Sequence, residues 1–219
     1  MTFKAPDSLA EQIAHHLAER IIRGDLKPGE RIQEQKVTLA LNVSRGSVRE
    51  ALLILERRHL IAILPRRGAH VTELTAHKVR SLCTLMSELY ILLGNAVASG
   101  WALQADMAPF LHIQQRLGAS YERQDIRAFV EDSFNVMRAA YPFANNPYLQ
   151  ETVENLQPAM SRAYFLALEQ RKAEMSEFLE LFERLLAAVI ARDLPQIRTV
   201  LSAYAQRSCD LVLSALPAA

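Results

Sequence analysis

Apolar residues recur at the spacing of an α-helix near the start of the chain. Ser8 is followed three residues later by Glu11, an arrangement typical of a capping box that opens a helix. The apolar stripe that follows consists of Leu9, Ile13, Leu17 and Ile21. Gly24 comes after the last apolar position and suits the end of a helix. The pattern therefore predicts one amphipathic helix between Ser8 and Gly24.

Two further helices are predicted after a connection over residues 24–30 that contains two glycines and a proline. The first is short and covers residues 34–41, and Asn42 suits the left-handed backbone of a helix end. Ser44 is expected to cap the second helix, which runs to about His59. The buried face of this helix follows the i, i+3, i+4, i+7 rule and consists of Val48, Ala51, Leu52 and Leu55.

A hairpin follows the three helices. Residues 61–64 and 69–72 have the composition of short strands, and Pro65-Arg66-Arg67-Gly68 lies between them. A hairpin tip with two arginines and a glycine can reach backbone phosphate or the minor groove of DNA. Three helices and such a hairpin predict a winged helix-turn-helix domain.

The start of the third helix carries the chemistry of a DNA-reading surface. Arg45 and Arg49 are four residues apart, so their side chains lie one above the other on one helix face. Gly46 and Ser47 between them are small and allow a partner to approach closely. Paired arginines and the hydroxyls of Ser44 and Ser47 at a helix N-terminus suit the major groove.

The rest of the chain shows only helical patterns and few glycines. Periodic segments cover residues 75–99, 105–118, 126–141, 147–170, 173–192 and 195–215. These segments predict an antiparallel helical bundle, with a kink or a split at Pro158. The fold class is therefore mainly α, with a winged helix-turn-helix domain over residues 1–74 and a helical domain over residues 75–219.

Composition narrows the function classes. The net charge of the 219 residues is only +1, but residues 1–75 carry 12 Lys and Arg against 9 Asp and Glu. Cys83 and Cys209 are too few and too far apart in sequence for a metal motif and are expected to be buried free thiols. The chain shows no long apolar run and no signal peptide, so a cytoplasmic location is expected.

An enzyme is disfavoured by the same sequence. It contains no nucleophile motif and no phosphate-binding glycine loop. Glu131 and Asp132 are adjacent, and neighbours on a helix point in different directions, which makes them a poor acid–base pair. A winged helix that binds protein is the alternative to one that binds DNA.

Three stretches in the first third of the chain closely resemble the GntR family of bacterial transcription regulators. They are residues 24–30, residues 43–52 and residues 65–68, which occur in order at the spacings of the family. The resemblance implies a homodimer bound to double-stranded operator DNA. The family often has an arginine that helps contact DNA where this chain has Gln35. The DNA-binding residues implied are Gln35, Ser44, Arg45, Gly46, Ser47, Arg49, Arg66, Arg67 and Gly68.

Residues 131–135, 146–149 and 185–193 resemble, more loosely, the C-terminal FCD domain of the FadR-type subgroup. This resemblance implies a helical bundle that binds an effector. Most members of the subgroup hold a divalent metal with one acidic residue and three histidines. In this chain the corresponding positions are occupied by Glu131, Asn135, Phe182 and Tyr204, which leave at most one strong ligand. The resemblance thus implies a bundle without metal or other cofactor.

The same comparison predicts an altered effector site. Phe182 lies 11 residues before Asp193 and Tyr204 lies 11 after it, so two antiparallel helices would place both at one depth. Ser87 replaces an arginine that is common in the subgroup. We therefore expect a small organic effector, partly apolar, on Phe182 and Tyr204, with Asn135 or Glu131 as polar anchor.

The residues also allow a second interpretation, in which the bundle centre is filled and the domain only dimerises. The operator sequence, the identity of the effector and the choice between repression and activation are left open.

Overall fold

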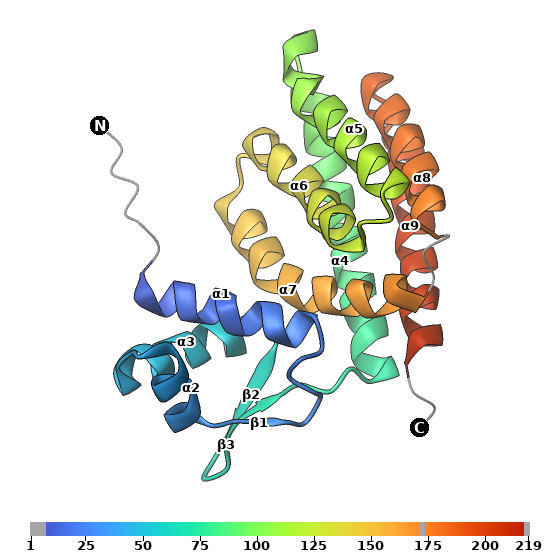
Figure 1. Cartoon of the computed structure of the whole chain (residues 1–219). Coiled ribbons are helices and arrows are strands. Elements are labelled where there is room, and N and C mark those ends of the chain that lie inside the picture. The colour runs from blue at the N-terminus through green and yellow to red at the C-terminus, as the bar shows by residue number, and fades with distance from the viewer. Residues whose placement is uncertain (1–7, 171–173, 217–219) are drawn as a thin grey trace, which may run out of the picture. The chain divides into compact units, whose positions relative to one another are not determined.

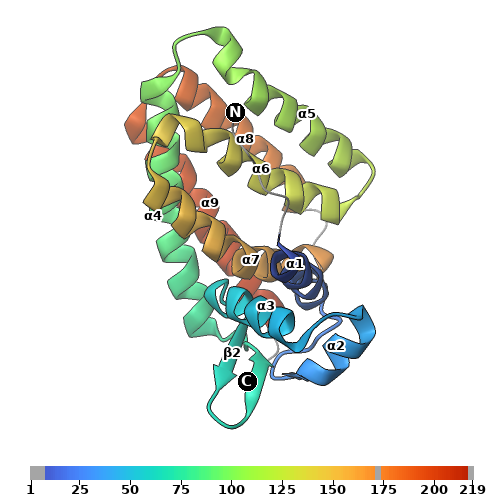
Figure 2. The ribbon, with the colours of Figure 1, turned by 90° about the vertical axis from the view of Figure 1, so that its left-hand side faces the viewer.

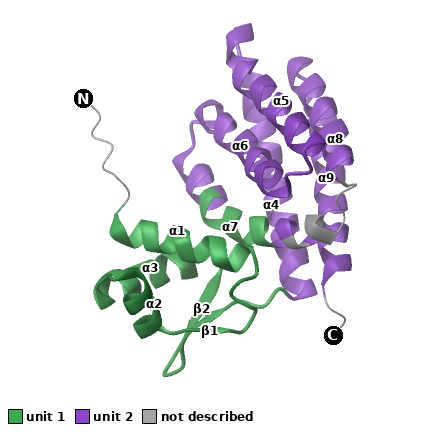
Figure 3. Cartoon of the chain, viewed as in Figure 1, with its two compact units in different colours: residues 1–74, 154–162 green, residues 75–153, 163–219 purple. Residues whose placement is uncertain are grey.

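The computed structural model describes residues 8–170 and 174–216. The chain forms two compact units, coloured separately in Figure 3. Unit 1 contains residues 1–74 and 154–162, and unit 2 contains residues 75–153 and 163–219. Within unit 1, the buried guanidinium of Arg162 donates hydrogen bonds to the carbonyl and hydroxyl oxygens of Thr72 at 2.7 and 3.1 Å. This contact joins residues 154–162 to the end of the first 74 residues.

The helices of unit 1 begin at the predicted residues, and only the third ends slightly early, at Arg57 rather than near His59. Helix α1 (Leu9–Ile22) is capped by the Ser8 hydroxyl, which accepts a hydrogen bond from the backbone N–H of Glu11 at 3.2 Å. Helix α2 (Glu34–Leu41) ends at Asn42, whose φ of 52° is left-handed. Helix α3 (Arg45–Arg57) is capped by Ser44, which accepts from the N–H of Ser47 at 3.1 Å.

A three-stranded antiparallel sheet completes unit 1 (Figure 1). Strands β2 (Ile61–Leu64) and β3 (Gly68–Val71) form the predicted hairpin, and β1 (Arg31–Ile32) pairs with the free edge of β3. The third strand was not expected. It contains two residues, too few to show the alternation by which a strand is recognised in sequence.

The core of unit 1 is made by the apolar stripes of α1 and α3 and by the inner face of the sheet. Its most deeply buried members include Ala14, Leu17, Ile21, Val48, Ala51, Leu55, Leu60, Ile61 and Val71. Leu9 departs from the predicted stripe, because its side chain is 48% exposed at the first position of α1.

The remaining chain is helical throughout the described residues, as predicted. The elements are α4 (Ala76–Gly100), a 3-10 turn (Gln104–Met107), α5 (Ala108–Glu122), α6 (Ile126–Ala144), α7 (Pro147–Gln170), α8 (Glu174–Ile190) and α9 (Leu194–Ala215). Helix α7 is continuous through Pro158, so the predicted interruption is not a split. A proline inside a helix removes one backbone hydrogen bond and costs about 3 kcal/mol or more, which the rest of this 24-residue helix offsets.

In unit 2, α4 packs against α6, α8 and α9, and α5 packs against α6 and α8 (Figure 2). Helix α4 is also long and apolar enough to cross a membrane, judged by length and composition alone, with a mean hydropathy of 1.4. The prediction that the chain has no long apolar run was therefore wrong for α4. Core helices of globular proteins pass the same test, and α4 supplies buried residues such as Met86, Ile91 and Leu93 to the bundle.

Helices α4 and α9 pack closely at Gly94. A Cβ atom at Gly94 would lie 2.9 Å from Cγ2 of Ile197 and 3.2 Å from Cδ1 of Leu201. Both neighbours are buried branched side chains with little room to move. The helix thus has glycine here because α9 occupies the space of a side chain.

We predict that Gly94→Ala lowers the free energy of unfolding by about 1–3 kcal/mol through overpacking. Helix propensity alone would make the alanine variant more stable by about 1 kcal/mol. The expected loss of stability would therefore show that overpacking outweighs helix propensity. Chemical denaturation of the two proteins measures the difference.

Gly118→Ala in α5 is the matched control, since no atom lies within 4 Å of an added Cβ there. This variant is expected to gain up to about 1 kcal/mol. Equal shifts of the same sign in both variants would show that α9 does not constrain position 94.

Candidate nucleic-acid interface and bundle cavity

The first turn of α3 is exposed and positively charged. Arg45, Gly46 and Arg49 are all exposed, and the hydroxyls of Ser44 and Ser47 lie 2.9 Å apart. The unpaired backbone N–H groups of a helix start add partial positive charge at the same place. An added Cβ at Gly46 would meet only the Ser44 hydroxyl, at an ordinary 3.7 Å, so nothing within unit 1 requires a glycine there.

Arg49 is held in position by the neighbouring helix α2. Its Nε donates to Oε2 of Glu34 at 2.9 Å, and the two side chains are 68% and 39% exposed. An ion pair this exposed contributes little to stability, so Arg49 can exchange Glu34 for a phosphate or a base edge at low cost. Gln35, beside Glu34 in the first turn of α2, is exposed.

The wing tip presents two more arginines on a turn of unusual backbone. Arg66 and Gly68 have left-handed φ values of 61° and 82°, and the N–H of Arg67 donates to the carbonyl of Leu64 at 3.1 Å. Both arginine side chains are exposed. The His70 ring lies 3.2 Å from the carbonyl of Gly29 and 3.3 Å from that of Arg67, which ties the turn to the preceding loop.

Arg31 belongs to the wing and was missed in the sequence. It lies opposite His70 in the pairing of β1 with β3, and its Nε and Nη2 come within 3.6 and 3.7 Å of the position of a Cβ on Gly68. Only the unexpected strand β1 brings it there. Six exposed arginines of unit 1 form no ion pair with any residue that the structure describes. Arg31, Arg45, Arg66 and Arg67 lie in the wing and at the start of α3, and the other two are Arg20 and Arg57.

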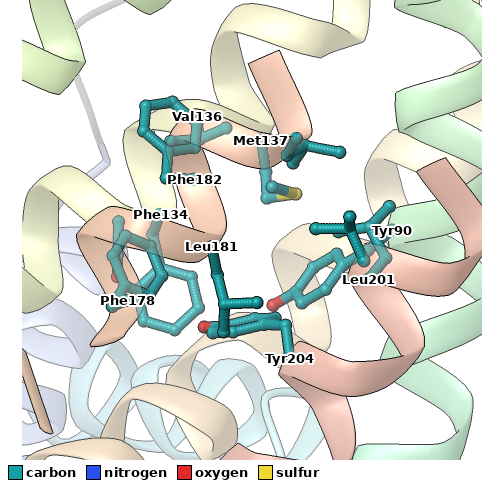
Figure 4. A pocket seen from close by; sticks show the side chains of 12 residues that line it. Tyr90, Phe134, Val136, Met137, Phe178, Leu181, Phe182, Leu201 and Tyr204 are labelled. Atoms are coloured by element: carbon teal, nitrogen blue, oxygen red, sulfur yellow. The ribbon is translucent and has the colours of Figure 1, made fainter. Parts of the chain in front are cut away.

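In unit 2, Phe182 of α8 and Tyr204 of α9 line one cavity in the bundle centre (Figure 4). The ring of Phe178 lies between them, 6.3 Å from Phe182 and 5.3 Å from Tyr204. The rest of the lining is almost entirely apolar and comprises Tyr90, Ser133, Phe134, Val136, Met137, Leu181, Leu185, Val200 and Leu201.

The cavity is small in this conformation. Its free volume is about 30 Å³, which is room for about one water molecule. Two further voids of about 30 Å³ adjoin it, one beyond Phe182 and one beyond Phe178 and Tyr204. Sites for organic ligands usually measure about 300–1,000 Å³. Aromatic rings therefore fill most of the space in which a ligand would lie.

Besides the Ser133 hydroxyl, which donates to the carbonyl of Val130, the polar groups of the cavity are neutral phenols. Burial raises the pKa of Tyr204 to about 12 and that of Tyr90 well above its usual value. The Tyr164 hydroxyl is hydrogen-bonded to Ser208, whose hydroxyl donates to the carbonyl of Tyr204 at 2.7 Å. At neutral pH these tyrosines are uncharged and can donate or accept a hydrogen bond.

The other residues expected at the effector site lie elsewhere. The Asn135 amide donates to Asp132 at 3.1 Å and accepts from Arg138 at 2.7 Å, and the buried Asp132 is also paired with Arg116 at 2.6 Å. Glu131 is exposed. These residues do not line the cavity, and neither does Ser87.

Ser87 instead lines a separate hollow between α4 and α9. Tyr90 and Tyr204 line the cavity with their hydroxyls, whereas Asn135 and Glu131 do not line it. Within the described part of the chain, no three His, Cys, Asp or Glu side chains converge as metal ligands do.

Comparison with known proteins gives two family matches. Residues 9–71 match the family described as "Bacterial regulatory proteins, gntR family", and residues 86–207 match the "FCD domain". The HTH-type transcriptional regulator McbR of Escherichia coli (strain K12) is 27% identical over 206 residues, which cover 94% of this chain and 93% of McbR. The gluconate operon transcriptional repressor of Bacillus subtilis (strain 168) is 28% identical over 174 residues, 78% of this chain and 69% of the repressor.

The fold agrees with these matches. The solved structure of E. coli McbR/YncC superposes with a TM-score of 0.81 at 25% identity and covers 95% of this chain and 99% of that one. The FCD match alone spans more than half of the 219 residues, and the gntR match covers the winged helix. This chain therefore belongs to the gntR family of bacterial regulatory proteins, a family of transcriptional regulators rather than enzymes, and carries an FCD domain.

Proposed function

We propose that this regulator binds palindromic operator DNA as a cytoplasmic homodimer and that an organic effector in the FCD bundle modulates the binding. The observation that carries the DNA half is the exposed, uncompensated charge of the first turn of α3. Arg45 has no ion-pair partner among the described residues, and Arg49 has only an exchangeable one. Two copies of such a helix, one on each half-site, account for the symmetry of operators read by helix-turn-helix dimers.

The effector half rests on the cavity between Phe182 and Tyr204. An effector that fits it is mostly apolar, because the lining is apolar, and carries an uncharged hydrogen-bonding group for the hydroxyls of Tyr90 and Tyr204. Entry requires Phe178 or Phe182 to change rotamer and merge the adjoining voids. An effector that binds only this opened state shifts the population toward it, which is the condition for regulation.

A second candidate function is supported by the free volume of about 30 Å³. With its centre filled by aromatic rings, the bundle would act as a metal-free dimerisation domain and bind no effector. A thermal-shift screen of small organic molecules separates the two functions. The effector function requires at least one compound that raises the melting temperature and also changes operator affinity.

We predict that Arg45→Ala weakens operator binding by about 1–3 kcal/mol and relaxes the preference at one base position in each half-site. Arg49→Ala is expected to weaken binding as well, whether the arginine meets a base or a phosphate. Fluorescence anisotropy with operator variants measures both effects. Wild-type affinity in both arginine variants would exclude the first turn of α3 as the reading surface.

Gly46→Ala tests the close approach without disturbing the fold. We expect normal or slightly raised thermal stability, because the added methyl group meets only ordinary contacts. Operator affinity is nevertheless expected to fall, since the methyl group would stand between α3 and the base edges. Unchanged affinity would mean that DNA does not approach α3 at this position.

For the wing, we predict that Arg66→Ala combined with Arg67→Ala flattens the salt dependence of operator binding. Each lost phosphate contact lowers the slope of log K against log salt by about 1. Arg31→Ala is expected to act in the same way, because its guanidinium lies against the wing glycine. Arg23→Ala, an exposed arginine already paired with Glu19, is the matched control. A slope that does not change in either wing variant would show that the wing stays away from phosphate.

For the bundle, we predict that the purified protein contains no stoichiometric Zn, Mn or Ni and that a chelator leaves its melting temperature unchanged. The positions that hold metal in the subgroup supply at most one strong ligand here, and a metal site needs about three convergent donors. Elemental analysis with one metal per chain would overturn this expectation.

The effector site is tested by Tyr204→Phe, which removes the hydroxyl and keeps the ring. For a compound selected by the screen, we expect the affinity to fall roughly 2- to 10-fold, the value of one hydrogen bond. Tyr148→Phe, at a side chain that is 80% exposed, is the matched control. Equal affinity in all three proteins would place the compound outside this cavity.

A further inference from the structure

Cys83 of α4 and Cys209 of α9 are not isolated buried thiols. Both are free and buried, at 6% and 7% exposure, and both line one hollow between α4 and α9. A buried cysteine usually behaves as a small apolar residue. Here two thiols from helices far apart in sequence meet in one place.

The register of α4 against α9 holds this pair together. Gly94 lies close to Ile197, and Tyr90 and Tyr204 line the same cavity. From Cys83 to Gly94, and from Ile197 to Cys209, the two helices advance by about 16–18 Å at 1.5 Å per residue. The close approach at Gly94 and the thiol pair therefore belong to one antiparallel seam.

A hollow of about 440 Å³ between α4 and α9 reaches both cysteines. Its lining is largely polar and includes Arg80, Ser87, Gln206 and Asp210. None of its lining residues belongs to the apolar cavity between Phe182 and Tyr204. A small polar molecule can thus reach the thiols without passing through the bundle centre.

We propose that Cys83 and Cys209 form a redox-modification site, at which a small hydroperoxide such as hydrogen peroxide converts the two thiols into a disulfide that joins α4 to α9. The site is separate from the proposed DNA and effector functions. In a reducing cytosol it would stay in the dithiol form and close only under oxidant, as cytosolic sensing disulfides do.

The reaction proceeds in two steps. The sulfur of Cys209 attacks one peroxide oxygen, the O–O bond breaks, and the departing hydroxide takes the thiol proton to give sulfenic acid and water. The sulfur of Cys83 then attacks the sulfur of Cys209, the S–O bond breaks, and a second water leaves with the proton of Cys83. The two sulfurs together lose two electrons, and one peroxide becomes two waters.

The environment of Cys83 supports this assignment of roles. Burial, followed by the neighbouring Cys209 and Asp210, raises the pKa of the Cys83 thiol to about 12. Cys83 is therefore a thiol at neutral pH and a poor nucleophile toward peroxide, because thiolate is the reactive form. As the resolving residue, it needs only to lie close to the sulfenic acid, and both cysteines line the same hollow.

The test treats the full-length protein with hydrogen peroxide, alkylates the remaining thiols and measures the mass of the intact chain. We expect the loss of two hydrogen atoms, no alkylation of either cysteine, and a peptide that links Cys83 to Cys209, all reversed by dithiothreitol. The melting temperature of the oxidised protein is expected to rise, since a long loop is closed.

Cys83→Ser and Cys209→Ser are the two control variants. In each, a hydroxyl group of similar size replaces the thiol and cannot form a disulfide. Neither should form the linked peptide or gain melting temperature on oxidation, and Cys83→Ser should trap sulfenic acid on Cys209. If one variant does not fold, the other variant and the peptide map of the unmodified sequence still test whether the disulfide forms. Two thiols that both remain alkylatable, sulfinic acid on one cysteine, or a disulfide between two chains would each overturn the proposal.

Discussion

The burial of one face of α3 is the constraint on which unit 1 depends. Val48, Ala51 and Leu55 have no exposed surface, so the helix can neither rotate nor slide without opening the core. At 3.6 residues per turn, the same fixed rotation turns Arg45 and Arg49 outward. The buried apolar face of α3 thus determines that Arg45 and Arg49 point to the outside. The ion pair with Glu34 adds orientation to Arg49 and little stability, because both side chains are largely in water.

In unit 2, the residues that line the central cavity carry no net charge. Its centre holds aromatic rings and uncharged tyrosine hydroxyls, whereas the buried carboxylate of Asp132 is satisfied by Arg116 and Asn135 away from the cavity. An ionised ligand in the centre would lose its hydration and find no opposite charge among the lining residues, which is strongly unfavourable. Whatever the centre accepts is therefore neutral where it is buried.

Local rules accounted for most of the fold. Ser8, Asn42 and Ser44 mark helix ends because a cap depends on one side chain and the next few backbone groups. Strand β1 was missed because its partner, β3, lies almost forty residues later and its two residues carry no pattern. Arg31 was missed for the same reason, since its place beside Gly68 exists only once β1 has paired.

The bundle cavity likewise combines features that could be predicted from local spacing with features that depend on distant contacts. The spacing of Phe182 and Tyr204 around Asp193 predicted that both reach one depth, and both line the cavity. The direction of Asn135 was not predictable from spacing, because it depends on hydrogen bonds to Asp132 and Arg138 rather than on helix period. Tyrosines within apolar stripes resemble ordinary core residues in sequence, which concealed Tyr90 as a polar group of the centre.

The seam between α4 and α9 connects these features physically. The two helices pack closely where Gly94 leaves room for Ile197, and Cys83 and Cys209 line one hollow between the same two helices. Tyr90 and Tyr204 lie on the same two helices between these contacts, so a change in helix separation at either end alters the polar groups of the cavity. A covalent link at the cysteines would restrict that separation, whereas a larger residue at Gly94 would increase it. The packing of one pair of helices therefore governs both the cavity and the thiols, although the two sites share no lining residue.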